Sequence, residues 1–477
     1  ATCAAGLCHR GPPCGGACAP DEVCYAPIDA CRPAVCPISC DAGYVRVARD
    51  PQAHIAVLCD RADEVCDCVR APPLVPADFG RYASMGLLNG RAVFAAYDAD
   101  FGDLVYVEDV ETGSPRVTYL DGVSADAPVT ADPTGPRGGR VQPGPDRGWY
   151  ARLAIDLKGR PQIVYYDADA GALRYLRADE DGHWQAPLVI DDRGDVGRYP
   201  RIAIDSVGGV HVIYTVVSGE AGEAGLRYAY AADGEPVSAS DFRITDVSMR
   251  GAPSAPAPPG ITPEAHGVMP CMRVGPDGRV YLAFYDGAER WPYLGRGDPA
   301  TGAFEVHRLT GELAPDFPPD PGGRYARLAE HDLGRFCDLE PDFEIGVLLA
   351  FVDHTSNALL MYRGPIEGGG DVEMIDPGGR GIRRLVGADP ALDLDREGRP
   401  VVVYQDATEN DVLLAVRTEA GWAATPSVVA SAGAMGFFNS LVVIGDEAVV
   451  GTLELATTAT GRGDHHLHVF RTQVPAF

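Results

Sequence analysis

The feature that most constrains the fold of this chain is a short phrase that recurs seven times along it. Each copy pairs a glycine with an aromatic or apolar residue and leads into a β-type run. The clearest copies are Gly80-Arg81-Tyr82, Gly148-Trp149-Tyr150 and Gly197-Arg198-Tyr199. The others are Gly267-Val268-Met269, Gly322-Gly323-Arg324-Tyr325, Gly387-Ala388-Asp389 and Gly436-Phe437-Phe438. Self-similarity at this spacing predicts a repeat architecture.

The residues after each phrase predict four short strands separated by Gly- and Asp-containing turns. In the second copy the strands are expected at Arg152–Asp156, Pro161–Asp167, Ala172–Leu176 and Ala186–Ile190. A four-stranded antiparallel meander is one blade of a β-propeller. We therefore expect an all-β, seven-bladed propeller over residues 71–477, since the alternative, a β-sandwich, needs no repeated unit.

The last copy supplies only three strands, Leu441–Ile444, Ala448–Leu455 and Leu467–Thr472. Because an unpaired sheet edge promotes aggregation, a fourth strand is expected from elsewhere in the chain. The segment Pro73–Phe79 directly precedes the first phrase, and we predict that it pairs with Leu467–Thr472 and closes the ring.

Cysteine is concentrated at the N-terminus: eleven of the thirteen cysteines lie between Cys3 and Cys68. This density predicts a small disulfide-rich module over residues 1–70, and hence an oxidising compartment. We expect a secreted or cell-surface protein, with Ala1 as a mature terminus. An odd count leaves one thiol free, ligated or available for an intermolecular disulfide. Cys271 and Cys337 fall in adjacent copies and are predicted to pair.

The net charge of −28 argues against nucleic acid and anionic lipid as partners. No run of eighteen apolar residues is present, so no membrane span is predicted.

The phrase Asp195–Asp205, with Val164-Tyr165-Tyr166-Asp167 and Leu173-Arg174-Tyr175, resembles repeats of exported bacterial β-propellers grouped with the sialidase-like superfamily. The resemblance covers about residues 80–472 and implies the fold. The superfamily's Asp-box, Ser-x-Asp-x-Gly-x-x-Trp, is absent in its proper form. The Cys-rich segment resembles modules of bacterial surface lipoproteins and adhesins.

Three arginines, Arg152, Arg201 and Arg327, occupy one repeat position, on the face where the inner strands begin. A planar guanidinium binds a carboxylate in bidentate fashion, and the resemblance implies such a triad because sialidases use three arginines. Four tyrosines are expected on the same rim: Tyr82, Tyr150, Tyr199 and Tyr325. The alternative is structural: the arginines pair with acids ending the second strands, Asp98, Asp167, Asp286, Asp353 and Asp406.

Asp98, Asp100 and Asp103 place carboxylates at close spacing in one turn, which suits calcium or, alternatively, capping of the turn itself. No other cofactor is expected. With no nucleophile elbow, zinc-protease or nucleotide motif present, we expect a binding protein rather than an enzyme. Its expected partner is a glycan, a peptide or a surface protein. The alternatives are a sialidase-like hydrolase or lyase, and a structural subunit of a surface filament or layer.

Overall fold

The computed structural model describes residues 78–251, 266–310, 332–378, 384–423, 425–458 and 463–475. It also describes residue 74 and the backbone of seven short strands between residues 2 and 70. The chain divides into two compact units, one of Ala1–Pro76 and Val123–Gly144, the other of Ala77–Gly122 and Pro145–Phe477. No helix among the described residues is long and apolar enough to cross a membrane.

The described residues of the first unit form seven short strands and one 3-10 helix, η4 (Pro136–Gly139). The strands are β1 (Thr2–Ala4), β2 (Leu7–His9), β3 (Glu22–Tyr25), β4 (Ala30–Pro33), β5 (Tyr44–Arg49), β6 (Ala56–Leu58) and β7 (Cys66–Arg70). They pair as β1-β2, β3-β4 and β6-β5-β7. The side chains of these strands, and with them the predicted disulfides of residues 1–70, lie outside the described residues. In the loop 123–144 of the same unit, the buried Arg137 guanidinium donates to the carbonyl oxygens of Arg140 and Gln142.

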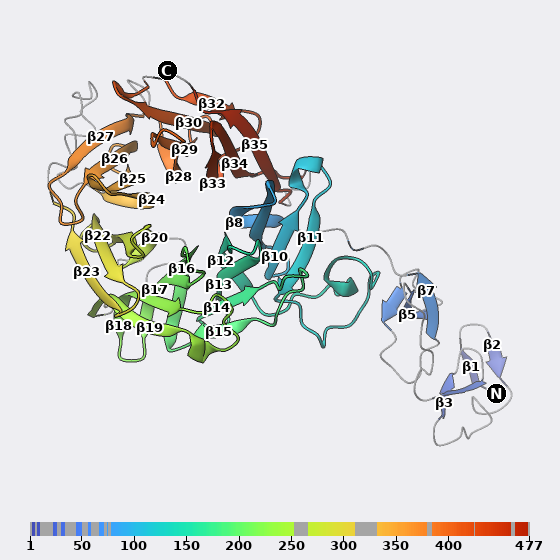
Figure 1. Cartoon of the computed structure of the whole chain (residues 1–477). Coiled ribbons are helices and arrows are strands. Elements are labelled where there is room, and N and C mark those ends of the chain that lie inside the picture. The colour runs from blue at the N-terminus through green and yellow to red at the C-terminus, as the bar shows by residue number, and fades with distance from the viewer. Residues whose placement is uncertain are drawn as a thin grey trace. The chain divides into compact units, whose positions relative to one another are not determined.

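The second unit is a ring of seven antiparallel sheets, which follow one another in chain order (Figure 1). The first three blades are β8 (Phe79–Leu88), β9 (Arg91–Asp98), β10 (Asp103–Glu108) and β11 (Arg116–Asp121); β12 (Arg147–Ile155), β13 (Pro161–Asp167), β14 (Ala172–Arg177) and β15 (Leu188–Asp191); and β16 (Gly194–Ile204), β17 (Val210–Gly219), β18 (Glu223–Ala231) and β19 (Arg243–Gly251). The next two are β20 (Val268–Val274), β21 (Val280–Asp286), β22 (Trp291–Asp298) and β23 (Ala303–Arg308); and β24 (Leu333–Asp342), β25 (Gly346–Asp353), β26 (Ala358–Gly364) and β27 (Asp371–Asp376). The last two are β28 (Val386–Leu394), β29 (Pro400–Asp406), β30 (Asp411–Thr418) and β32 (Ser427–Ala430), with β31 (Gly421–Trp422) beside the end of β30; and β33 (Phe437–Ile444), β34 (Glu447–Glu454) and β35 (His466–Gln473). The predicted all-β, seven-bladed propeller of four-stranded blades is confirmed, with three strands described in the seventh.

Burial explains why the second strands read as nearly continuous apolar runs. Each lies between two blades, so both of its faces are covered; every residue of β13, β21 and β29 is buried. Between the first two blades, for example, Val93 and Leu104 pack against Leu153 and Tyr165. Burying such a side chain contributes about 1.5–3 kcal/mol, so each interblade seam holds its neighbours rigidly.

The ring closes between the seventh and first blades through the inner strands and their neighbours. The Met85 amide donates to Ser440 Oγ at 3.2 Å, and Phe94 lies in one apolar cluster with Leu453 and Leu467. The predicted pairing of Pro73–Phe79 with β35 lies mostly outside the described residues and stays a prediction.

Only Leu74, Asp78 and Phe79 of that segment are described. Phe79 begins β8 opposite Asp98, and Asp78 Oδ1 accepts a hydrogen bond from the His465 amide at 2.9 Å. The segment therefore reaches the N-terminal end of β35.

The fifth copy of the repeat begins later than the sequence suggested. Its inner strand is β24, and its phrase is Gly334-Arg335-Phe336, not the phrase ending in Tyr325. Gly334 and Phe336 adopt φ of 101° and 52°, matching Gly80 and Tyr82 at 127° and 55°. The placement near Tyr325 is wrong because its Gly-Gly-Arg-Tyr string resembles the other copies more closely than the true one does.

Candidate functional site

Each inner strand carries one residue in the left-handed region, at the third position of the repeated phrase. Their φ angles run from 45° to 56°. The residues are Tyr82, Tyr150, Tyr199, Met269, Phe336, Asp389 and Phe438. At each of them the ladder to the second strand slips, which is a bulge in the inner strand. A left-handed non-glycine residue costs about 1–2 kcal/mol. Because all seven blades adopt this conformation at the same position, we infer that it serves to orient side chains toward the ring axis.

These bulges surround one cavity of about 360 Å³ that is lined by all seven inner strands. Its rim carries an arc of aromatic rings. The ring centroid of Tyr82 lies 5.4 Å from that of Phe438 and 4.7 Å from that of Tyr150, which lies 4.3 Å from Tyr199. Burial raises the pKa of the Tyr82 and Tyr150 phenols, so both remain neutral at ordinary pH and offer a hydroxyl beside an apolar face.

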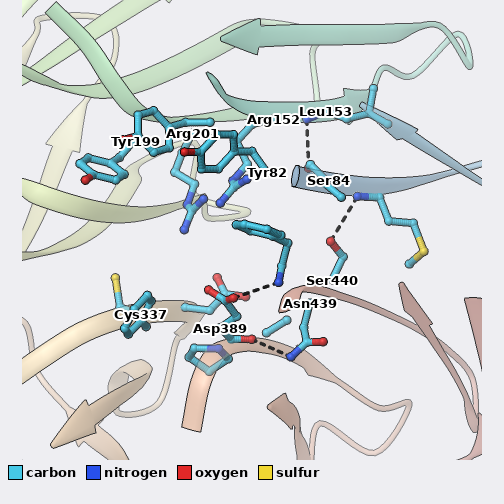
Figure 2. A pocket seen from close by; sticks show the side chains of 18 of the residues that line it. Tyr82, Ser84, Arg152, Leu153, Tyr199, Arg201, Cys337, Asp389, Asn439 and Ser440 are labelled. Carbon is cyan, nitrogen blue, oxygen red and sulfur yellow. Dashed lines mark hydrogen bonds between the residues drawn. The ribbon is translucent and has the colours of Figure 1, made fainter. Parts of the chain in front are cut away.

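Two arginines enter the cavity from adjacent blades, Arg152 from β12 and Arg201 from β16 (Figure 2). Arg152 donates to its neighbour's backbone, the Ala151 carbonyl oxygen, at 2.9 Å. Among the described residues, neither guanidinium forms an ion pair, and Arg201 forms no hydrogen bond. Burial lowers the pKa of both groups, and the charge of Arg201 lowers that of Arg152 further. The two guanidinium groups thus share a partly buried space, and among the described residues no anion is bound to either.

Asp389, on β28, faces these arginines from the other side of the cavity (Figure 2). Its carboxylate accepts a hydrogen bond from the Phe438 amide at 2.9 Å. Burial raises the pKa of this carboxyl. Asp389 therefore influences the charge of the cavity without neutralising Arg152 or Arg201 by contact.

A third arginine on the cavity wall, Arg273, differs because it is fully paired. Its Nε lies 2.6 Å from Glu340 Oε1 and its Nη2 lies 3.1 Å from Asp338 Oδ2. Although burial opposes it, the two carboxylates raise the pKa of Arg273. Burial raises the pKa of Glu340 to about 7, with Arg273 opposing and Asp338 reinforcing the rise. Arg273 is thus a structural cation with two carboxylate partners, whereas Arg152 and Arg201 have no ion-pair partner among the described residues.

The structure brings together five of the predicted site residues: Tyr82, Tyr150, Tyr199, Arg152 and Arg201. Tyr325 and Arg327 lie outside the described residues, and the fifth blade contributes Phe336 and Asp338 at the equivalent positions. Sequence reasoning missed Asp338, Asp389 and Arg273. The signal for the first two was the repeat itself, since they occupy the positions of Arg152 and Tyr150 in other blades.

The second-strand acids do not pair with the cavity arginines. Asp167 contacts Arg147 and Arg174, at 3.1 and 2.6 Å, and Asp406 pairs with Arg384. The structural alternative, in which these acids neutralise Arg152 and Arg201, is therefore not what the described residues show.

The predicted pair Cys271 and Cys337 is joined by a disulfide between adjacent inner strands. Cys271 takes the repeat position of Arg152 and Arg201. Cys337 lies on β24. The bond links the fourth and fifth blades at the cavity wall.

The acidic turn of the first blade is built mainly by hydrogen bonds to backbone. Asp98 Oδ1 accepts from the amides of Asp100 at 2.9 Å and Phe101 at 3.3 Å. Burial raises the pKa of Asp98 to about 7. Among the described side chains, three metal-ligating groups converge only at a different place, the turn Asp179, Asp181 and His183. Calcium at Asp98, Asp100 and Asp103 stays a prediction.

No protein-family model matches this chain. No curated protein matches it either. Solved structures with a similar fold include the polysaccharide lyase Uly1, 10% identical over 85% of this chain and 93% of that one, with a TM-score of 0.44. A subtype N11 neuraminidase-like protein of A/flat-faced bat/Peru/033/2010 is 9% identical over 91% and 95% of the chains, at 0.40. A puromycin hydrolase is 16% identical over 82% of this chain and 55% of that one, at 0.42. The similarity to these structures concerns the fold and assigns no activity to this chain.

Proposed function

We propose that this protein binds a small ligand through a carboxylate, held by Arg152 and Arg201 in the central cavity. The observation that carries this proposal is the absence of an ion-pair partner for either arginine among the described residues. Buried charges are normally paired, because desolvating an unpaired charge is costly. Two adjacent unpaired guanidinium groups therefore suit an anion that arrives with the ligand, and planar carboxylates match the guanidinium fork.

The cavity limits the size and the chemistry of that ligand. Its volume of about 360 Å³ suits a monosaccharide or a short peptide end rather than a long polymer. The arc of Tyr82, Tyr150 and Tyr199 offers ring faces for a sugar ring or an apolar side chain, with hydroxyls at its edge. A net charge of −28 repels polyanions at long range, which favours a ligand carrying a single carboxylate.

We place this binding protein outside the cytoplasm, at the cell surface or secreted. The disulfide between Cys271 and Cys337 and the cysteine-rich residues 1–70 support this placement, because disulfides persist in oxidising compartments. A glycan or a surface protein with an exposed carboxylate is the partner that fits both the site and the location.

A second candidate is a glycan hydrolase or lyase that acts in the same cavity. Asp389 favours it, because a carboxyl with a raised pKa opposite two carboxylate-binding arginines is placed to exchange a proton with a bound sugar. Turnover of sialyl or uronyl glycosides that disappears in an Asp389→Asn variant, with ligand binding retained, would promote this candidate over binding alone.

Isothermal titration with matched neutral probes tests the binding proposal. The probes are N-acetylneuraminic acid and galacturonic acid, each against its methyl ester, and a dipeptide against its C-terminal amide. We expect an acid to bind and its neutral partner to fail, because only the acid supplies the missing charge.

The matched variants are Arg201→Gln and Arg296→Gln. Arg201→Gln should weaken acid binding at least about 30-fold, the effect of losing one partner of a desolvated charge pair. Arg296 pairs with Glu305 away from the cavity, so its variant should bind as wild type does. Equal binding of acid and ester, or no loss in Arg201→Gln, would overturn the proposal.

A further inference from the structure

Three side chains at the seam between the third and fourth blades form a hydrogen-bonded chain that is separate from the central cavity. Ser248 belongs to β19, His266 lies two residues before β20, and Asp286 ends β21. Ser248 Oγ lies 2.6 Å from His266 Nε2, and His266 Nδ1 lies 2.6 Å from Asp286 Oδ2. This is the order and reach of a nucleophile, a general base and an orienting acid.

The Asp286 carboxylate determines which ring nitrogen of His266 carries the proton. Asp286 Oδ1 accepts hydrogen bonds from the amides of Ala288 at 2.9 Å and Glu289 at 2.8 Å, and Oδ2 also lies 2.7 Å from Arg250 Nη1. Although burial opposes it, the hydrogen bond from His266 and the charge of Arg250 lower the pKa of Asp286. An ionised carboxylate only accepts, so the imidazole proton sits on Nδ1. The lone pair of Nε2 is then free to accept the Ser248 hydroxyl proton.

The imidazole is held in place by two aromatic rings. His266 is buried, and its ring stands edge-on to Phe284 at 4.9 Å and to Tyr293 at 5.4 Å between centroids, both at 85°. Ser248 remains half-buried rather than enclosed. The base is therefore rigid, while Ser248 keeps part of its surface exposed.

The repeat shows that this trio replaces a structural ion triplet. Between the first two blades the same places hold Asp121, Arg147 and Asp167, with Arg147 2.8 Å from Asp121 and 3.1 Å from Asp167. Between the fifth and sixth blades Asp376 and Asp406 hold the equivalent places, and Arg384, which stands two residues before the place of Arg147 in the repeat, pairs with both.

The residue two before the second-strand acid changes together with the triplet. Tyr165 donates to Asp121 at 2.5 Å, and Tyr404 donates to Asp376 at 2.8 Å. At the Ser248 seam this residue is Phe284, which offers no hydroxyl. Compared with these two seams, the acid, the arginine and the tyrosine are all replaced, and the Ser248 hydroxyl has His266 as its side-chain partner among the described residues.

We propose that Ser248 is a nucleophile, with His266 as its general base, in a second site that hydrolyses small acyl esters. Ser248 Oγ attacks the ester carbonyl carbon while its proton passes to His266 Nε2. The tetrahedral intermediate collapses, the ester C–O bond breaks, and the leaving alkoxide takes that proton as an alcohol. Water then attacks the acyl-serine, gives a proton to Nε2, and Ser248 recovers a proton as the carboxylic acid departs. Ester and water yield acid and alcohol, and no cofactor is consumed.

A fluorophosphonate probe on the full chain tests this site, since such probes phosphonylate an activated serine with loss of fluoride. We expect one adduct by intact mass, on the peptide that contains Ser248, and none in Ser248→Ala. The matched control is Ser356→Ala, because Ser356 Oγ bonds a second-strand acid, Asp353, at 2.6 Å without a histidine. This control should label as wild type does.

His266→Gln should slow labelling and p-nitrophenyl acetate hydrolysis at least about 100-fold, the scale of lost general-base catalysis. If the three residues had only a structural role, these variants would change thermal stability but not the rate of labelling. Absence of labelling in the folded wild type, labelling on another serine, or unchanged labelling in Ser248→Ala would overturn the proposal. Because Ser248→Ala removes only one oxygen, the test holds even if His266→Gln fails to fold.

Discussion

Replacing Arg201 by methionine should stabilise the ligand-free protein while it abolishes carboxylate binding. Arg201 has no acid bound to it among the described residues, shares the cavity with Arg152, and has a lowered pKa because of burial. Its charge therefore costs free energy in the unliganded state. Methionine keeps much of the volume and removes the charge. An arginine with a structural role would give the opposite sign.

The magnitude follows from the cost of a buried charge. Exchanging poorly compensated buried charges for apolar groups of similar size stabilises proteins by 1–4 kcal/mol in favourable cases. Arg201 lines a cavity and is only half-buried, so we expect the lower part of that range, about 1–2 kcal/mol. With an unfolding entropy near 2.1 cal/mol/K per residue over about 400 residues, this corresponds to roughly 1–2 °C in Tm.

The matched control is Arg273→Met, at the same cavity but with a paired guanidinium. Its removal leaves Asp338 and Glu340 without their cation, so the free energy of unfolding should fall by about 1–3 kcal/mol, the cost of leaving partly buried polar groups unsatisfied. Urea unfolding followed by tryptophan fluorescence measures both variants. A loss of stability in Arg201→Met comparable to that in Arg273→Met would refute the reasoning that Arg201 is kept for a ligand.

Three further predictions concern pH, the disulfide and ring closure. Carboxylate affinity should fall as pH rises through the raised pKa of Asp389, because that carboxyl faces the two arginines and is neutral below its pKa and anionic above it; titration calorimetry from pH 4 to 8 should show this fall, and a flat profile would contradict it. The pair variant Cys271→Ser/Cys337→Ser should lose about 4 kcal/mol of unfolding free energy, because the bond spans a separation of 66 residues; denaturation unchanged from wild type would argue against the bond. Deleting residues 1–72 should leave the propeller monomeric by sedimentation. Deleting residues 1–77 should instead expose the edge of β35 and cause association. Identical behaviour of the two variants would contradict the prediction that residues 73–79 close the ring.

The sequence contained enough to predict the ring and half of the cavity. The repeat predicted seven blades because each copy carries the same turn and strand spacing, and it placed Arg152 and Arg201 at one position. The fifth copy was misplaced because local similarity favoured Tyr325 over Phe336, whose neighbours depart from the pattern. That error concealed Asp338, which occupies the arginine position.

Other features depend on contacts that a linear pattern does not contain. Asp389 faces Arg152 across the ring, so their relation exists only after seven blades close. Ser248 and His266 are brought together by neighbouring blades, and the residues between them carry no recognisable motif. Comparison of equivalent places in successive blades reveals them, since the same places hold Asp121 and Arg147 elsewhere.

A crystal structure with a bound carboxylate ligand tests the central claim most directly. The account predicts carboxylate oxygens about 2.8 Å from guanidinium nitrogens of both Arg152 and Arg201, with the rest of the ligand against the tyrosine arc. A ligand seated elsewhere on the propeller, or a ligand in the cavity whose carboxylate avoids both arginines, would contradict it.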